Sequence, residues 1–139
     1  MNRYRFEDIK VGLKASFTVK ITEEMMNSFR NITGDINPLH TDDDFAVKKG
    51  FEGKVAYGML TASFLSALAG VYLPGENSLI RQVEVKFKKP VFPGDELTVT
   101  GEVSDVNEEF KIFDMKVTVV NASGDKVLRG TMQMGVLDA

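Results

Sequence analysis

The run from Met59 to Val71 contains no charged residue and constrains the fold more than any other part of the sequence. A helix that is apolar on all sides is one that the rest of the protein surrounds. Gly58 precedes the run, and the turn formers Leu73-Pro74-Gly75 end it. The run is too short for a membrane span, which needs about 20 apolar residues. We therefore expect a long buried helix from Gly58 to Leu73.

The segments around this helix alternate apolar and polar residues, which is typical of β-strands. One segment, 15–21, precedes the helix, and the others follow it at 83–87, 97–103, 113–119 and 128–136. Amphipathic strands with tight connections form an antiparallel sheet with one apolar face. The sequence thus predicts an α+β fold in which a curved sheet of about five strands wraps around the helix. The open edges of such a sheet favour a homodimer.

Composition narrows the class of protein. A length of 139 residues suits one domain, and 43% hydrophobic with 27% charged residues is ordinary for a globular protein. The net charge of −3 does not favour nucleic-acid binding. Without cysteine and with one histidine, Cys- and His-based metal sites are excluded, and the acids at 42–44 suit a helix start better than a Mg²⁺ site. The charged N-terminus lacks the apolar run of a signal peptide, so we expect a cytoplasmic protein with no metal and no membrane segment.

A second constrained stretch, Gly34–Ala46 (GDINPLHTDDDFA), contains the only histidine, His40, five positions after Asp35. Helix signals lie on both sides: N-caps at Thr22 and Thr41, and stops at Gly34 and Gly50. Pro38 pushes the residue before it towards an extended conformation, so no single helix can run through. We expect Asp35 and His40 on a tight connection between two helices, where a carboxylate and an imidazole keep a fixed relation.

The spacing of these two residues also fits a plainer interpretation. An Asp after a helix-ending glycine commonly forms a turn, with its side chain on a backbone N–H. A lone histidine before a capping threonine is often a surface or capping residue. The spacing alone does not decide between these interpretations and a catalytic one.

The residues Phe29–His40, continued to Ala46, resemble the signature of the MaoC-like family of (R)-specific enoyl-CoA hydratases. The resemblance lies in the aromatic residue, the small residue before Gly-Asp, the Asn-Pro-aliphatic-His run and the small residue six places after the histidine. It continues through Gly58-Met59-Leu60 and the region of Ser66. It covers most of the chain and implies a single hot-dog domain over residues 1–139.

Members of that family add water to trans-2-enoyl thioesters, or remove it in reverse, without a metal or redox cofactor. The resemblance implies that Asp35 and His40 hold one water molecule. His40 would be the main base, and Asp35 would orient the water and donate the proton to C2 of the substrate. The free N–H of Gly58, at the positive end of the buried helix, is a candidate to stabilise the negative charge on the thioester oxygen.

Other residues are expected to support this site. Ser66 corresponds to a serine near the catalytic pair in the family, and it could instead bond back to the carbonyl of Ala62. Asn37 is expected to cap the loop through its amide. Tyr57 stands where many relatives carry histidine, and we expect it to alter polarity at the mouth of the substrate site.

Contacts with the substrate are expected from two groups of residues. Met59, Phe64 and Leu65 would line the gap between helix and sheet and set the acyl length. Lys86 and Lys88 would bind the phosphates of CoA or of an acyl carrier protein. Alternating lysines on a strand are also typical of its solvated face.

Three alternatives to an enoyl-CoA hydratase remain open at this stage. A 3-hydroxyacyl dehydratase acting on acyl carrier protein would differ in the class of substrate. A hot-dog thioesterase also uses activated water, although the Asp and Asn-Pro-x-His arrangement is that of the hydratases. A non-catalytic domain that binds acyl thioesters would not need both Asp35 and His40, which makes it the weakest alternative.

Overall fold

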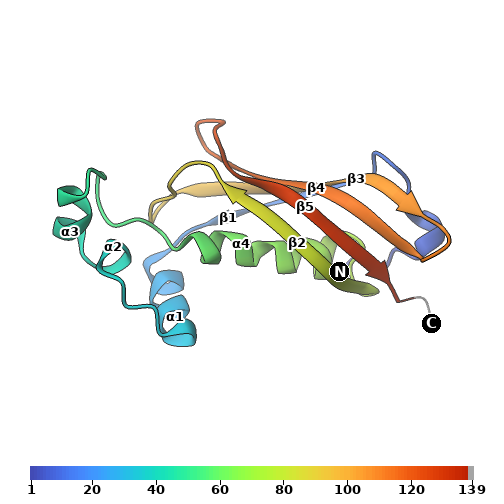
Figure 1. Cartoon of the computed structure of the whole chain (residues 1–139), viewed down its shortest axis with the longest axis horizontal. Helices are drawn as coiled ribbons and strands as arrows, with labels where there is room; N and C mark the ends of the chain where they lie inside the picture. Colours follow the sequence, from blue (N-terminus) through green and yellow to red (C-terminus); the bar gives the residue numbers. More distant parts are fainter. Residues whose placement is uncertain (138–139) are drawn as a thin grey trace.

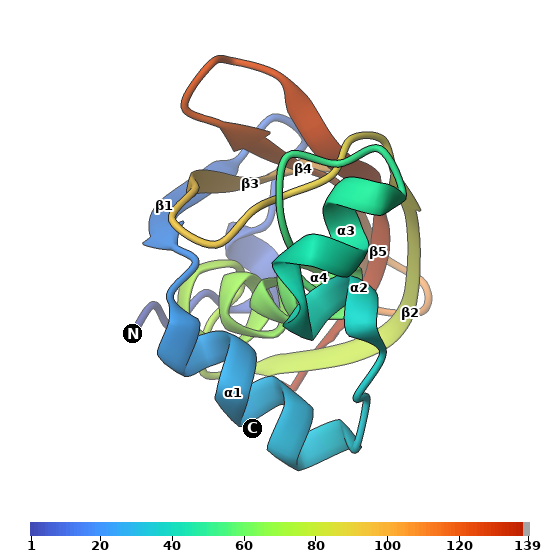
Figure 2. The same ribbon diagram turned by 90° about the vertical axis from the view of Figure 1, so that its left-hand side faces the viewer.

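The computed structural model describes residues 1–137 and contains one five-stranded antiparallel sheet. The strands are β1 (Lys14–Lys20), β2 (Ser78–Phe87), β3 (Glu96–Asn107), β4 (Ile112–Asn121) and β5 (Lys126–Val136). Their order in the sheet is β1-β3-β4-β5-β2, with every pair antiparallel. All five strands expected from the alternation of apolar and polar residues are present. The sheet curves around helix α4 (Gly58–Ala67), with β1 and β2 as its two edges (Figure 2).

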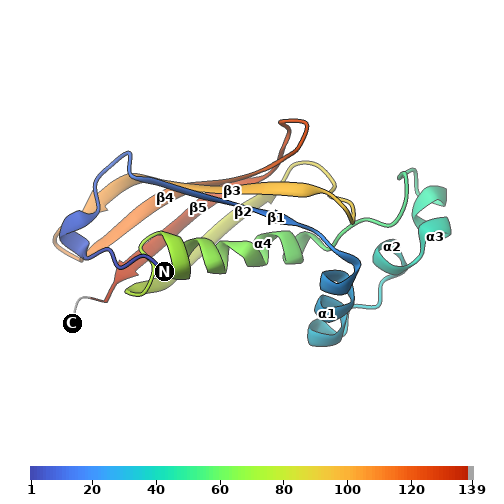
Figure 3. The same ribbon diagram turned by 180° about the vertical axis from the view of Figure 1, so that it is seen from behind.

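Three further α-helices lie at one end of the molecule, and a short 3-10 helix, Phe6–Asp8, lies at the other (Figure 1). The three α-helices are α1 (Glu23–Thr33), α2 (Pro38–Thr41) and α3 (Asp43–Lys48). Figure 1 shows that α1–α3 project beyond the sheet on the side where α4 begins. The view from behind shows the same arrangement, with β1 running from the sheet towards α1 (Figure 3). The Asp35–His40 segment therefore lies near the N-terminus of α4, although more than fifteen residues of chain separate them.

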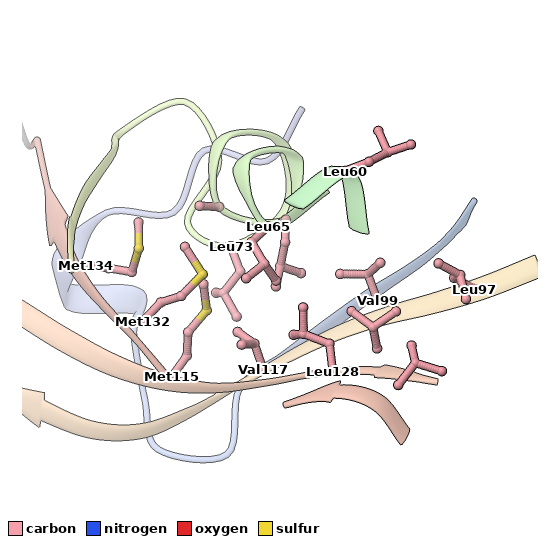
Figure 4. Packing of buried hydrophobic residues seen from close by; sticks show 14 of the residues in the cluster. Leu60, Leu65, Leu73, Leu97, Val99, Met115, Val117, Leu128, Met132 and Met134 are labelled. Carbon is pink, nitrogen blue, oxygen red and sulfur yellow. The ribbon is translucent and has the colours of Figure 1, made fainter. Parts of the chain in front are cut away.

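The core lies between the inner face of the sheet and α4. Leu65 of α4 and Leu68 after it are buried against side chains from β3, β4 and β5. Figure 4 shows this cluster, in which Met115 and Met132 come from neighbouring strands. Burial of one such side chain contributes about 1.5–3 kcal/mol, so this packing fixes α4 firmly on the sheet.

Helix α4 differs from the expected helix in two respects. It is α-helical only to Ala67, and a π-helical turn, Leu68–Tyr72, completes the expected length. It is also not enclosed on all sides, because Met59, Ser63 and Ser66 are exposed. A single curved sheet covers one side of a helix and leaves the other side uncovered.

Strand β2 is an edge strand with an unusually apolar exposed surface. Val83 pairs in register with the buried Met132 of β5, so its side chain faces the inner side of the sheet. It is nevertheless 45% exposed, and Ile80 and Phe87, which pair with the buried Met134 and Leu128 on the same face, are also exposed. The inner side of this edge therefore lacks the cover that the rest of the sheet receives from α4. Among the described helices, none is long and apolar enough to cross a membrane.

Candidate active site

The loop after α1 places Asp35. Thr22 caps the start of α1 through a bond from the N–H of Met25, as expected, and Gly34 ends the helix in the left-handed conformation with φ of 77°. The carboxylate of Asp35 accepts a hydrogen bond from the N–H of Asn37 at 3.0 Å. Asp35 therefore forms the turn that the plainer interpretation predicted. One carboxylate oxygen is thereby fixed against the backbone.

His40 lies on a helix and not on the connecting loop. Pro38 occupies the first turn of α2, where its missing N–H is not needed, and Asn37 caps that turn by accepting from the N–H of Leu39 at 3.0 Å. Thr41 therefore ends α2, and Asp42 replaces it as the N-cap of α3. The prediction that Asn37 caps this segment through its amide is confirmed. The backbone of Asn37 is nearly extended, as expected before a proline, with φ of −56° and ψ of 127°. The expectation that His40 lies on the connecting loop was wrong, because Pro38 begins a short helix as readily as it prevents one from continuing.

The imidazole of His40 is held in one orientation by the backbone. Its Nδ1 lies 2.7 Å from the carbonyl oxygen of Val55. A carbonyl oxygen can only accept a hydrogen bond, so Nδ1 carries the proton and donates it. In the neutral ring Nε2 then has a free lone pair. This is the tautomer that a general base requires.

Asp35, His40 and Gly58 line one cavity of about 530 Å³. The remaining lining residues are Phe29, Thr33, Tyr57, Met59 and Phe87. The structure thus brings together the two side chains and the backbone group that the sequence singled out as catalytic. Met59 and Tyr57, predicted to contact substrate, lie in the same cavity.

Gly58 is the first residue of α4, and the residue before it provides no side-chain cap. Within residues 1–137 the Gly58 N–H has no hydrogen-bond acceptor, so this donor remains available at the positive end of the helix. The ring of Phe87 packs against the same residue, because a Cβ built on Gly58 would lie 3.2 Å from Cε1 of Phe87. A side chain at this position would displace the half-exposed Phe87 ring by a few tenths of an ångström, so glycine suits both this contact and access to the N–H.

Tyr57 lines this cavity with an almost completely buried side chain. It is 2% exposed, and its hydroxyl donates a hydrogen bond to the backbone carbonyl of Asp35 at 2.6 Å. Its ring packs against His40, with ring centroids 4.3 Å apart, and against Phe29 at 4.9 Å. Burial, together with the negative charge of Asp35, raises the pKa of Tyr57 above its usual value of 10.0. The hydroxyl consequently stays protonated as a donor at neutral pH.

Comparison with known proteins shows the family of this chain. Residues 6–124 match the model of the MaoC like domain. This chain belongs to the MaoC-like family. It is 38% identical to an (R)-specific enoyl-CoA hydratase of Rhodospirillum rubrum over 125 residues, covering 90% of this chain and 86% of that protein. It is 36% identical to a 3-hydroxybutyryl-CoA dehydratase of Methylorubrum extorquens over 88% of this chain and 77% of that one.

A solved structure extends this comparison to the fold. The (R)-hydratase from Aeromonas caviae matches this MaoC-like chain with a TM-score of 0.90 and 32% identity, covering 94% of this chain and 98% of that one. The expected hot-dog fold of the MaoC-like hydratases is therefore confirmed.

The remaining residues predicted to support the site or to bind substrate in this MaoC-like domain lie outside the cavity of Asp35 and His40. Ser66 is exposed on α4 and does not line the cavity of Asp35 and His40, and Phe64 packs against the core. Lys86 lies on the outer face of the sheet, in a groove that contains neither catalytic candidate. Lys88 follows the end of β2 and lines a second cavity of about 330 Å³ that also contains His40. The two lysines predicted to bind phosphate thus lie in different cavities, only one of which adjoins the site.

Sequence reasoning missed two residues that the MaoC-like site contains. Phe87 lines both cavities and covers Gly58. The strand pattern placed Phe87 on the inner face, but its contact with Gly58 depends on how β2 passes α4. Thr61 is 2% exposed, lines the second cavity, and has a hydroxyl without a hydrogen-bond partner among residues 1–137. In the same described range, no group of three or more His, Cys, Asp or Glu side chains could hold a metal ion.

Proposed function

We propose that this protein is an (R)-specific enoyl-CoA hydratase, which adds water to trans-2-enoyl thioesters and catalyses the reverse dehydration. The observation that carries the proposal is a single cavity that contains a His40 ring with its base nitrogen free, the Asp35 carboxylate and the Gly58 N–H. Relatives that align over most of this chain are named for this hydration or its reverse. Because α4 fixes Gly58 and Val55 fixes His40, the groups are set in place before substrate arrives.

The chemistry follows from the roles of these groups. Water is too weak a nucleophile to attack C3 unaided, so Nε2 of His40 takes one of its protons as the C3–O bond forms. The π electrons move towards the thioester carbonyl, whose oxygen becomes an oxyanion facing the Gly58 N–H. The proton that His40 has taken passes to Asp35, which also orients the water, and Asp35 donates it to C2 on the same face. Both side chains thereby return to their starting state, and the substrate has gained one hydrogen at C2 and one hydroxyl at C3, so the two groups work as a pair.

No metal or redox cofactor is part of this proposed reaction. A base activates the attacking water, and a backbone donor stabilises the developing negative charge. The partner is an acyl-CoA thioester, with Lys88 as a candidate for contact with its phosphates. Dialysis against EDTA is expected to leave the rate unchanged, and a loss restored by an added divalent ion would contradict this part of the proposal. The cytoplasm stays the predicted location, to be checked by cell fractionation.

We also expect two copies of this chain to associate as a homodimer. Val83 and Phe87 of β2 are exposed, and so is Met59 on the uncovered side of α4, so apolar side chains face solvent at this edge of the domain. The backbone of an edge strand also offers unpaired hydrogen-bonding groups. A second copy of this chain can cover both through a two-fold contact, in which the same surface serves both partners.

The function is tested with crotonyl-CoA and the purified protein. We expect the absorbance of the enoyl thioester to fall and (R)-3-hydroxybutyryl-CoA to accumulate. The substitutions His40→Gln and Asp35→Asn should each lower kcat by several orders of magnitude while circular dichroism stays unchanged. Release of free thiol without hydration would favour a thioesterase, and turnover only with carrier-protein thioesters would favour the dehydratase alternative. Near-normal rates in either variant would contradict the catalytic assignment.

A further inference from the structure

The segment Val55–Gly58 contacts every group of the proposed site. The N–H of Val55 donates to the carbonyl of Leu39, and its carbonyl accepts from Nδ1 of His40. Tyr57 reaches the carbonyl of Asp35, and Gly58 supplies the backbone donor. One short stretch of chain thus sets the positions of groups that belong to the α1–α2 segment.

The position of Asp35 depends on residues 55–58 more than the position of His40 does. The bonds at Asp35 other than the one from Tyr57 are local: its N–H donates to Oγ1 of Thr33, and its carboxylate accepts from Asn37. The neighbouring Ile36 is 76% exposed, so packing does little to hold this loop. Among residues 1–137, the Tyr57 hydroxyl is the one hydrogen bond that joins Asp35 to a distant part of the chain.

Tyr57 also fixes the plane of the His40 ring. The two rings lie at 31° with centroids 4.3 Å apart, and Phe29 supports Tyr57 from the α1 side at 4.9 Å. Aromatic pairs at such distances attract each other beyond the burial of their area. The Val55 carbonyl fixes one edge of the imidazole, and the Tyr57 ring fixes its face.

We propose that Tyr57 is a positioning residue, which holds the Asp35 carbonyl with its hydroxyl and the His40 ring with its aromatic face. This role differs from the contact with substrate that the sequence predicted, and it rests on the proposed hydratase function. Tyr57 does not touch the reacting atoms. It keeps the acid and the imidazole at a constant spacing in front of Gly58, and a small misplacement of such groups can lower a rate by about 100-fold.

Two substitutions separate the two contacts. Tyr57→Phe removes the hydroxyl and keeps the ring, whereas Tyr57→Leu removes both. We expect Tyr57→Phe to lower kcat by about 10- to 100-fold, with KM for crotonyl-CoA within about two-fold of wild type. Tyr57→Leu should lower kcat further. Tyr72→Phe is the matched control, because Tyr72 stacks on Phe17 in a different part of the fold, and its kcat should equal that of wild type.

A second readout does not depend on activity. His40 is the only histidine, so a tag-free protein shows one set of imidazole proton resonances in an NMR spectrum. The Tyr57 ring shifts these resonances through its ring current. We expect the shift to persist in Tyr57→Phe, to disappear in Tyr57→Leu and to be unchanged in Tyr72→Phe. Thermal unfolding checks that each variant is folded.

The outcomes distinguish the two proposals. If wild type does not hydrate crotonyl-CoA, the proposed function is wrong, and the resonances still report whether Tyr57 holds the imidazole. If wild type is active and Tyr57→Phe retains its kcat, the hydroxyl does not position Asp35 and this inference is overturned. Resonances that stay in place in folded Tyr57→Leu overturn the role of the ring. A rise in KM at constant kcat in Tyr57→Phe would instead assign the hydroxyl to substrate binding.

Discussion

At the scale of single residues, one backbone contact determines what His40 can do. A carbonyl acceptor on Nδ1 selects the tautomer with a free Nε2, and Val55 provides that acceptor. A histidine motif in a sequence cannot show this, because the acceptor lies fifteen residues away. The motif predicted the pair of residues, and the structure adds an orientation that suits His40 to the proposed role of base.

The Gly58 N–H can be tested by a matched pair of substitutions. Gly58→Pro removes the donor, and proline is tolerated at the first position of a helix after an extended residue such as Tyr57. Gly58→Ala adds a similar Cβ near Phe87 but keeps the N–H. We expect kcat to fall by about 100- to 1,000-fold in the proline variant and much less in the alanine variant. Steady-state kinetics on crotonyl-CoA measures both, and equal losses would show that crowding of Phe87, and not the donor, limits the rate.

The raised pKa of Tyr57 predicts how stability changes at alkaline pH. In the unfolded chain the phenol loses its proton near pH 10, whereas burial and Asp35 keep it protonated to higher pH in the folded protein. This contribution to stability is fully present below about pH 10 and is lost as the pH rises through the folded pKa. We expect the free energy of unfolding, measured with urea, to fall less steeply above about pH 10 in Tyr57→Phe than in wild type. If the free energy of unfolding fell equally steeply with pH in the two proteins, this would argue against a raised pKa of Tyr57.

At the scale of elements, the sequence predicted the regular parts of the fold and missed the short ones. Alternation placed all five strands, and the Thr22 and Gly34 signals placed both ends of α1. Helix α2 was missed because four residues, Pro38–Thr41, are too few for periodicity to show. The cap from Asn37 provides part of the stability that so short a helix lacks.

The cap of α2 therefore has a predicted effect on function. Asn37→Ala removes the acceptor for the Leu39 N–H and should lower the free energy of unfolding by about 1 kcal/mol. Because α2 carries His40, kcat should fall as well. Thr22→Ala, which removes the cap of α1, is the control with a similar loss of stability. Urea unfolding measures the stability of both variants, and kinetics with crotonyl-CoA measures their kcat. Equal kcat in the two variants would contradict the link between the cap and the site.

At the scale of the whole molecule, the open edge of the sheet determines how copies associate. Val83 faces the inner side of β2 and is 45% exposed, whereas Lys86 on the same strand lies on the outer face. Val83→Lys places an unpaired charge in the proposed contact and should convert dimers to monomers. Lys86→Ser should leave the dimer intact. Light scattering after size exclusion measures the mass, and a dimeric Val83→Lys variant would show that copies pair elsewhere.

Strand β2 forms the free edge of the sheet and also carries Phe87, which covers Gly58 in the cavity. The same strand therefore takes part in the proposed dimer contact and in the proposed active site. Given the proposed pairing, dilution separates the copies, frees the phenyl ring and lowers the activity per molecule. The enzyme would then respond to its own concentration without any added effector.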